Sequence, residues 1–480
     1  MSQGSDEMTK PVNYNSRNGT ARCAIGFILA STLALQAGAS WAAEQSRFSD
    51  EPIPMMTEDQ FPARTQPILE LGDPFLSTGN LAPGYELPTG AVWQPRFWVY
   101  GNMRGAVQGY DTGAPGSSGV SEAAVRLDLF GNLQLTGTER VLIGVQPLHE
   151  NGQFTRYTFK PDSQDGGDNH TNLRVSTLFF EGDIAELFPR WDVLDSTPND
   201  LGFSIGRQAM SFQNGFIIND TVDAVGLTRN NVRFQGVPWL ISLRTSAVYA
   251  WDQIHRDNNR DDNQAQLFGL FTQIDTIPST INIDAIYVNS ERSTGDDLLV
   301  GGIDAIQRIG KVTSTFRIAG SWAPDTKTAA ADDGVLLFTE LSYTPPYSDN
   351  IAYLNGFAGF NNFSSAARDP TAGGPLGATG ILFAARGIGT FPSPLSNRAD
   401  DAYGAAVGYQ MFLDGIRRQL IVEFGGRRDT SPGGFDAAGF AARLQQAIGT
   451  RFLLQLDGFV TGQEDRDTGL GLRTELQVKF

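Results

Sequence analysis

Three histidines, at positions 149, 170 and 255, are the side chains of this 480-residue sequence best suited to act as a general base near neutral pH. A hydrolase would need a nucleophile within hydrogen-bond reach of such a base. Each histidine falls in an expected connection, within two residues of an Asp, Asn or Glu, which favours a solvated loop residue. No nucleophile-elbow, HExxH or phosphate-loop motif accompanies them. The sequence therefore predicts no enzyme.

Two Asp-rich stretches could bind Ca²⁺ or bridge lipopolysaccharide through it, but neither has EF-hand spacing, and a solvated acidic loop is the favoured interpretation. They contain Asp162, Asp165 and Asp168 in one case, and Asp257, Asp261 and Asp262 in the other. The formal charge of −17 argues against a nucleic-acid partner. We expect no cofactor and no metal site.

The N-terminus has the order of a secretory signal, which is basic, apolar and then small. Lys10, Arg17 and Arg22 precede an apolar run from Cys23 to Leu35, and Ser40-Trp41-Ala42 offers a cleavage site. A membrane anchor is the less favoured alternative because polar residues interrupt the short run. Cys23 is the only cysteine, so the mature chain would have no thiol, which excludes disulfides, Fe–S clusters and covalent haem within it.

From Pro95 onward, polar and apolar residues alternate, which places the two sets on opposite faces of β-strands. The runs reach about ten residues, the length that a tilted strand needs to cross a bilayer, whereas sandwich strands have about five or six. The clearest runs are 97–108, 125–135 and 312–322. The pattern predicts an all-β, antiparallel, up-and-down transmembrane β-barrel in the cell outer membrane.

Short and long connections also alternate, as in barrels with tight periplasmic turns and long outer loops. The short turns are expected near residues 137–139, 235–238, 275–279, 307–311, 344–349, 413–417 and 449–450. The connection 185–201 is long where a short one is expected. Counting strands gives about 18, with 16 as the alternative, and an even number would put both termini on the periplasmic side.

The expected organisation has three parts: a signal peptide at 1–42, a periplasmic N-terminal segment at 43–92 and the barrel at 93–480. The middle segment is rich in Pro, Asp and Glu. We interpret it as an extended lead-in, partly packed into the barrel mouth, with a disordered tail as the alternative.

The final strand alternates up to Phe480, with Leu476, Val478 and Phe480 on its apolar face. A closing strand must be apolar toward lipid, and its free edge is what an insertion machinery can grip. This pattern resembles the C-terminal signature of bacterial outer-membrane proteins. The expected partners are therefore outer-membrane lipid, lipopolysaccharide and the barrel-assembly machinery.

Gly206-Arg207-Gln208 and the residues up to Asp220 resemble the Gly-Arg-Gln strand and following loop of alginate-export-type porins. That resemblance implies a barrel of 18 strands that passes a polyanion through an arginine-lined lumen. The chain has Gly215-Phe216-Ile217 where typical members have Gly-Arg-Leu, so the substrate does not carry over.

A barrel of this size encloses a lumen wider than side chains can fill, which predicts a porin-like channel for a hydrophilic, anionic or saccharide-like solute. The alternative is a structural barrel that sheathes or anchors a periplasmic partner such as a multihaem cytochrome. In the alternative to anion binding, the luminal arginines pair with carboxylates, and these pairs fill the interior. The residues expected to line the pore are Arg96, Arg104, Arg126, Asp128, Arg244 and Arg317.

The longest connection, 361–400, is polar at its start but apolar in its middle, which would be an aggregation liability in water. It could fold inward and narrow the pore, or residues 380–390 could merely extend a neighbouring strand. Its apolar residues are Leu376, Ile381, Leu382, Phe383, Ile388 and Phe391.

Overall fold

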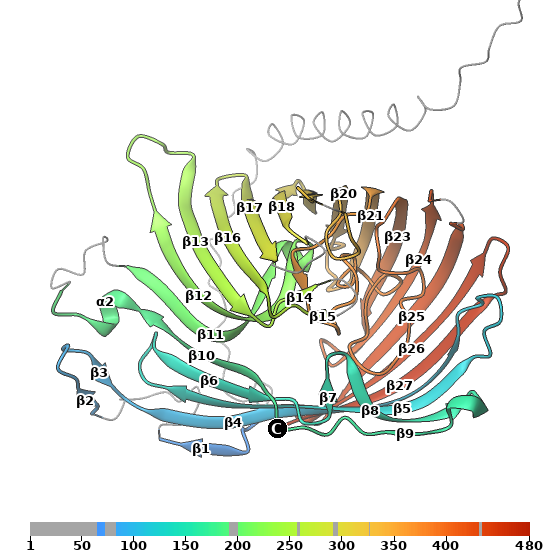
Figure 1. Cartoon of the computed structure of the whole chain (residues 1–480), viewed down its shortest axis with the longest axis horizontal. Coiled ribbons are helices and arrows are strands. Elements are labelled where there is room, and N and C mark those ends of the chain that lie inside the picture. The colour runs from blue at the N-terminus through green and yellow to red at the C-terminus, as the bar shows by residue number, and fades with distance from the viewer. Residues whose placement is uncertain are drawn as a thin grey trace, which may run out of the picture. The chain divides into compact units, whose positions relative to one another are not determined.

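Strands of the described chain close into one antiparallel barrel (Figure 1). The computed structural model describes residues 65–72, 83–191, 200–256, 260–290, 296–325, 327–431 and 434–480. Within these ranges eighteen strands form the wall, and the last, β27, pairs with the first, β4. The expected all-β barrel of 18 strands is thereby confirmed.

The wall strands, in chain order, are β4 (Arg96–Asp111), β5 (Val120–Gln134), β6 (Arg140–Val145), β10 (Val175–Asp183), β11 (Leu201–Phe212), β12 (Ile218–Val232), β13 (Leu240–Asp252), β16 (Ala265–Thr276), β17 (Ser279–Ser290), β18 (Leu298–Ile309), β19 (Val312–Trp322), β20 (Gly334–Tyr343), β21 (Ile351–Asn361), β23 (Ala402–Phe412), β24 (Arg418–Asp429), β25 (Ala437–Ile448), β26 (Phe452–Gln463) and β27 (Gly469–Lys479). Most have ten or more residues, as expected for strands that cross a bilayer at a tilt.

Alternation assigns one face of each strand to the outside and one to the lumen. On β5, Arg126 and Asp128 face the lumen, because Arg126 bonds both Asp128 and a segment inside the barrel. Leu127 and Leu129, of opposite parity, therefore face outward. The same rule explains why Ile318 on β19 is exposed while Arg317 beside it is buried.

The connections divide between two rims. Seven of the connections at one rim are short, at residues 135–139, 233–239, 277–278, 310–311, 344–350, 413–417 and 449–451. The connection between β10 and β11 belongs to the same rim and is long, as the sequence indicates, and it contains α2 (Ile184–Leu187). We call this the short-turn rim and the opposite one the long-loop rim. Assignment of the short-turn rim to the periplasm stays a prediction.

The barrel closes where β27 meets β4. Lys479 pairs with Asn102, and the backbone amide and carbonyl of Phe480 both bond Gly101. The Phe480 ring lies so near Gly101 that an added Cβ there would stand 3.1 Å from a ring carbon. Toward the N-terminus of β4, beyond Gly101, β1 (Leu69–Leu71) pairs with residues 97–99 of β4. It covers the part of the β4 edge that β27 leaves free.

Replacing Phe480 by Asp is expected to lower the amount of folded barrel, because it puts a charge at the apolar end of the closing strand. The measurement is the fraction of heat-modifiable protein in the outer-membrane fraction. Lys479→Gln, an exposed change on the neighbouring residue, is the matched control. Equal folded fractions for Phe480→Asp and wild type would contradict the assembly role.

The expected signal peptide at 1–42 lies outside the described residues. Of the 43–92 segment, the structure describes β1, β2 (Tyr85–Glu86) and β3 (Val92–Trp93), and β1 is joined to the wall. Among the described residues, no helix is long and apolar enough to cross a membrane.

Candidate functional site

The long connection between β21 and β23, residues 362–401, folds into the lumen; we call it the inner loop. Its expected apolar residues are all buried there, which confirms that the loop turns inward. Phe383 packs edge-on against Phe357 of β21, and Phe391 packs edge-on against Phe459 of β26. Wall strands β23, β24 and β25 lie between β21 and β26, so the loop runs along the inside of the wall there.

Two wall carboxylates hold the inner loop by accepting its backbone N–H groups. Glu423 of β24 accepts from Leu382 at 2.8 Å and also from Ile381, while Glu122 of β5 accepts from Thr390 at 2.6 Å. Glu122 and Glu423 are each 1% exposed. Charge-assisted bonds of this kind are about twice as strong as neutral ones, so they fix the loop to the wall.

Glycines make this close approach possible. Gly380 has φ +53°, and a Cβ at that position would collide with the Glu423 carboxylate. Gly389 has φ +61° and lies equally close to Glu122. Both positions combine a left-handed backbone with contact to a wall carboxylate, which only glycine tolerates without strain.

Arginines on the neighbouring strands donate to the loop's carbonyl groups. Arg104 of β4 donates to the Arg386 carbonyl at 3.1 Å, and Arg126 of β5 donates to the Gly387 carbonyl at 3.1 Å. Arg104 also holds Glu475 of β27 at 2.6 Å. The inner loop is thus bonded to the wall from β24 around the seam to β5.

The hairpin between β11 and β12 also enters the lumen. Its tip carries Phe216, Ile217 and Ile218, which are almost fully buried. Arg317 of β19 lies over the Phe216 ring at 4.5 Å and donates to Asp304 of β18 at 2.8 Å. β22 (Ala367–Arg368) of the inner loop pairs in parallel with the start of β12, so hairpin and loop form one plug.

The six residues expected to line the pore all belong to wall strands, and the structure gives them different surroundings. Arg104, Arg126 and Arg317 are paired with carboxylates, and Asp128 accepts from Arg126 and Gln146. Arg96 lies 5.9 Å from the Trp98 ring, and Arg244 is exposed and donates to Gln273 at 2.6 Å. Whether these residues line a conducting path stays a prediction.

The histidines differ from the sequence expectation. His149 and His255 are only 6% and 4% exposed, so they are not solvated loop residues. They lie in β7 (His149–Glu150) and β14 (His255–Arg256), short strands of connections that turn inward. The sequence missed this because a loop folded inside a barrel has the same polar composition as one in water. His170 is partly exposed.

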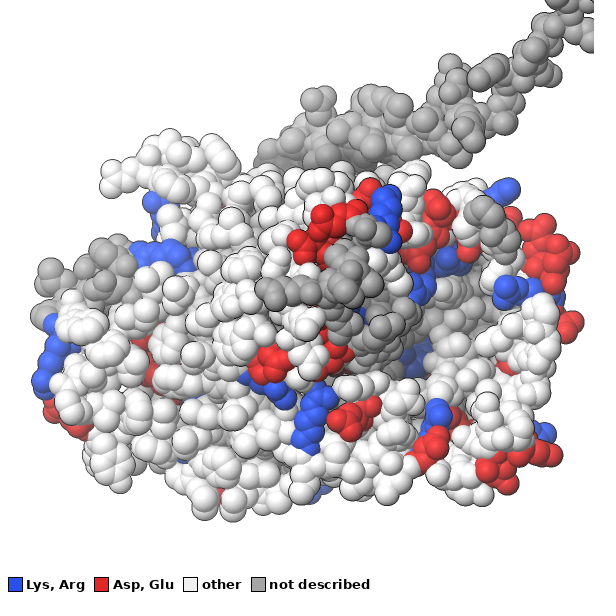
Figure 2. Space-filling model, viewed as in Figure 1, with Lys and Arg blue, Asp and Glu red and all other residues white. Residues whose placement is uncertain are grey.

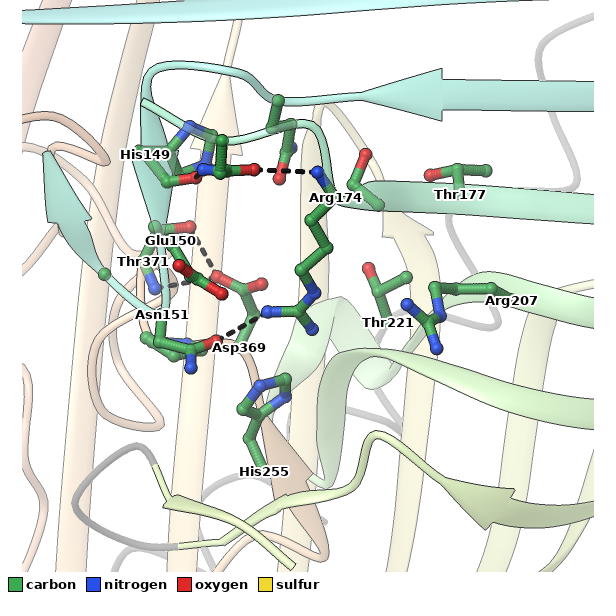
Figure 3. Close-up of a pocket in the computed structure, with 15 residues that line it drawn as sticks. His149, Glu150, Asn151, Arg174, Thr177, Arg207, Thr221, His255, Asp369 and Thr371 are labelled. Atoms are coloured by element: carbon green, nitrogen blue, oxygen red, sulfur yellow. Dashed lines mark hydrogen bonds between the residues drawn. The ribbon is translucent and has the colours of Figure 1, made fainter. Parts of the chain in front are cut away.

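Two polar cavities lie beside the inner loop. The larger has a volume of about 450 Å³ and is formed by β14, the β19–β20 connection and the inner loop. The smaller, of about 70 Å³, is lined by the connection between β6 and β8 (Gln153–Lys160) and the connection between β9 (Gly166–Asp168) and β10. Its other walls are the start of β10, β11, β12, β14 and the inner loop (Figure 3). His255 and Pro370 line both cavities, so these two residues stand where the cavities meet.

Charge is distributed unevenly over the face shown in Figure 2. Acidic and basic side chains gather at the right-hand rim, where the β26–β27 connection lies in Figure 1, and most of the wall to the left is white. Among the described residues, no cluster of three His, Cys, Asp or Glu side chains could hold a metal ion. Asp257, part of one expected acidic stretch, lies outside those residues.

Sequence reasoning missed several residues of this site, including the wall carboxylates Glu122 and Glu423. Arg368 is another: it donates to the Gly374 carbonyl at 2.7 Å and to the Gly215 carbonyl, and so ties the inner loop to the hairpin tip. A possible signal for the hairpin was Phe216-Ile217-Ile218, an apolar group in a position expected to be a connection.

No protein-family model matches the sequence, and no curated protein matches it. Solved structures do resemble the fold. The outer membrane protein OpdK from Pseudomonas aeruginosa superposes with a TM-score of 0.53 at 12% identity, over 80% of this chain and 98% of its own.

A BenF-like porin from Pseudomonas fluorescens Pf-5 gives a TM-score of 0.54 at 10% identity, over 80% of this chain and 99% of its own. OccAB4 from Acinetobacter baumannii gives 0.53 at 10% identity, over 82% and 100%. At these identities the likeness establishes the fold: the chain is a closed barrel with the architecture of outer-membrane porins. A likeness to alginate-export porins is not among these findings.

Proposed function

We propose that this protein is an outer-membrane channel for the passive passage of small hydrophilic solutes. The observation that carries the proposal is an 18-stranded barrel with an inner loop bonded to its wall. The loop narrows the lumen but leaves polar cavities beside it. Barrels of this size enclose an aqueous channel unless something fills them. The fold shared with OpdK and the BenF-like porin supports the same reading.

The outward apolar residues support a location in the outer membrane, with lipid and lipopolysaccharide as the surroundings of the wall. Insertion through the barrel-assembly machinery is part of the proposal. The proposed channel function involves no catalytic step and no cofactor.

The contents of the lumen weigh against a sheath around a periplasmic cytochrome. Such a sheath needs a wide interior, whereas here the inner loop and the β11–β12 hairpin occupy it with a shared apolar core. The Gly206–Asp220 stretch, which resembles alginate-export-type porins, forms the end of β11, the hairpin tip and the start of β12. Because this stretch has Gly215-Phe216-Ile217 where typical members have Gly-Arg-Leu, the polyanion substrate of that family does not carry over.

Recording from purified protein in planar bilayers tests the channel proposal. The expected result is discrete, ohmic current steps from folded protein. Folded, inserted protein that gives no steps with small ions would overturn it.

The channel is expected to favour anions, because arginines of β4 and β5 lie against the inner loop and guanidinium groups hold carboxylates. In a salt gradient, the wild-type reversal potential should indicate anion preference. Arg104→Gln and Arg126→Gln should each reduce it, although both arginines are paired here. Cation selectivity that survives both changes would contradict the expectation and favour the interior-filling role.

A further inference from the structure

Two polar cavities lie on one side of the inner loop. Toward β4, β5 and β24, the loop is bonded to the wall through Glu122, Glu423, Arg104 and Arg126. On the other side, the two polar cavities are lined jointly by the inner loop, by β14 and by the connections that precede β8 and β10. These cavities offer a polar route past the loop.

His255 is held rigidly where the two cavities meet. Its backbone N–H and its ring Nδ1 each lie 2.8 Å from a different oxygen of Asp220 on β12. This arrangement places the Nδ1 proton toward the carboxylate and leaves Nε2 as the titrating atom. Nε2 has no hydrogen-bond partner in the protein. Figure 3 shows the ring pointing toward Arg174 in the middle of the smaller cavity.

We propose that solutes pass the inner loop through the junction of the two cavities, and that His255 determines their charge preference there. This rests on the proposed channel function. Nε2 is itself buried, so the ring acts on a passing solute through its charge: a protonated ring places a positive charge beside the solute, whereas a neutral ring does not. The preference for anions at this point therefore falls when His255 loses its proton.

The electrostatic setting of His255 supports this assignment. Burial lowers its pKa, but the hydrogen bond and charge of Asp220 outweigh burial, and the pKa lies above its ordinary value of 6.5. The carboxylates of Asp369 on the inner loop and Asp261 on β15 (Arg260–Asp261) add to this effect. Because the pKa is raised, the ring is still charged at pH 6.5 and loses its charge as the pH rises through the raised pKa.

Other charged groups face the same space. The neighbouring permanent cations are Arg174 and Arg207 in the smaller cavity and Arg256, Arg368 and Arg398 in the larger. Burial lowers the pKa of Arg368 only to about 10, so it stays charged. Glu150 also lines the smaller cavity and is exposed.

His149 provides a matched comparison, since it lines the smaller cavity and is equally buried. Burial and the Arg126 charge lower its pKa to about 4, so it is neutral throughout the neutral range. Of these two histidines, only His255 can therefore make the ion selectivity at this cavity depend on pH above 6.

The test is the ratio of chloride to potassium permeability, from reversal potentials in a KCl gradient between pH 6 and 9. In wild type, the ratio should fall about two- to fivefold as pH rises, the effect of removing one unit charge near a partly screened ion. His255→Gln should give a ratio that does not change with pH, whereas His149→Gln should keep the wild-type fall. Asp220→Asn, which keeps the histidine, should move the midpoint to lower pH.

The outcomes separate the two proposals. Folded protein without any current would overturn the channel itself. Current whose selectivity is independent of pH, or whose pH dependence survives in His255→Gln, would leave the channel standing and overturn the role of His255. If His255→Gln does not fold, an unshifted midpoint in folded Asp220→Asn overturns the role, and a midpoint moved to lower pH supports it.

Discussion

Replacing residues Gly373–Arg386 by a short Gly/Ser linker is expected to raise single-channel current several-fold while the barrel stays folded. This segment contains Leu376, Ile381, Leu382 and Phe383, which belong to the part of the inner loop that lies in the lumen. The wall strands close without it, because none of their ladder pairs involves these residues. Its removal leaves an 18-stranded barrel with a wider aqueous path.

The matched control replaces Ala114–Ser118 of the β4–β5 connection, which lies at the same rim and is largely exposed, by a linker of equal length. Its current should equal that of wild type. A second variant, Glu423→Gln, keeps the loop but weakens the bonds that hold Ile381 and Leu382, and should produce current fluctuations between two levels. Unchanged current in the loop replacement, with heat-modifiability intact, would place the loop outside the conducting path.

The outer surface of the barrel could be predicted from the sequence because water and lipid impose a simple rule on it. On β4, β5, β19 and β27, one face meets lipid and the other meets a polar lumen, so the side chains alternate visibly. Short turns between such strands are equally visible. Strand number and the positions of the seven short turns followed from these two signals.

The interior could not be predicted in the same way. Strands β16, β17, β18 and β20 carry buried apolar residues toward the lumen as well as exposed ones outside, for instance Ile286 beside Tyr287 on β17. Their inner face is apolar because the hairpin tip packs on it, through contacts such as Phe216 with Phe338. Alternation is lost where both faces are apolar, and the sequence gives no separate indication of what fills the lumen.

The carboxylates that hold the inner loop were missed for a related reason. Glu122 bonds Thr390, which lies 268 residues away along the chain. Glu423 of β24 bonds residues of the inner loop, which precedes β23. A buried anchor and a luminal charge look alike in an alternating strand, because both are polar residues on the inner face. Only the path of the inner loop distinguishes them.

Leu129→Arg is expected to destabilise the folded barrel by about 2–4 kcal/mol, the cost of a charge on the lipid face near the bilayer midplane. Leu129 lies within β5, where it pairs with Gly101 of β4 and Val145 of β6. The measurement is a reversible urea titration of the protein in lipid vesicles. Leu129→Val, which keeps an apolar side chain at the same place, is the control and should cost far less.

On sequence alone, Asp128→Ala is expected to be much milder than Leu129→Arg, because a polar residue facing the lumen should be replaceable. The structure changes that expectation, since Asp128 is buried and accepts bonds from both Arg126 and Gln146. Its loss leaves a partly buried guanidinium without its carboxylate and should cost about 1–3 kcal/mol. Because Arg126 also holds the Gly387 carbonyl, Asp128→Ala should alter conductance, which Leu129→Arg should leave unchanged in the molecules that fold. If both substitutions were mild and neither altered conductance, the assignment of β5 faces to lipid and lumen would be wrong.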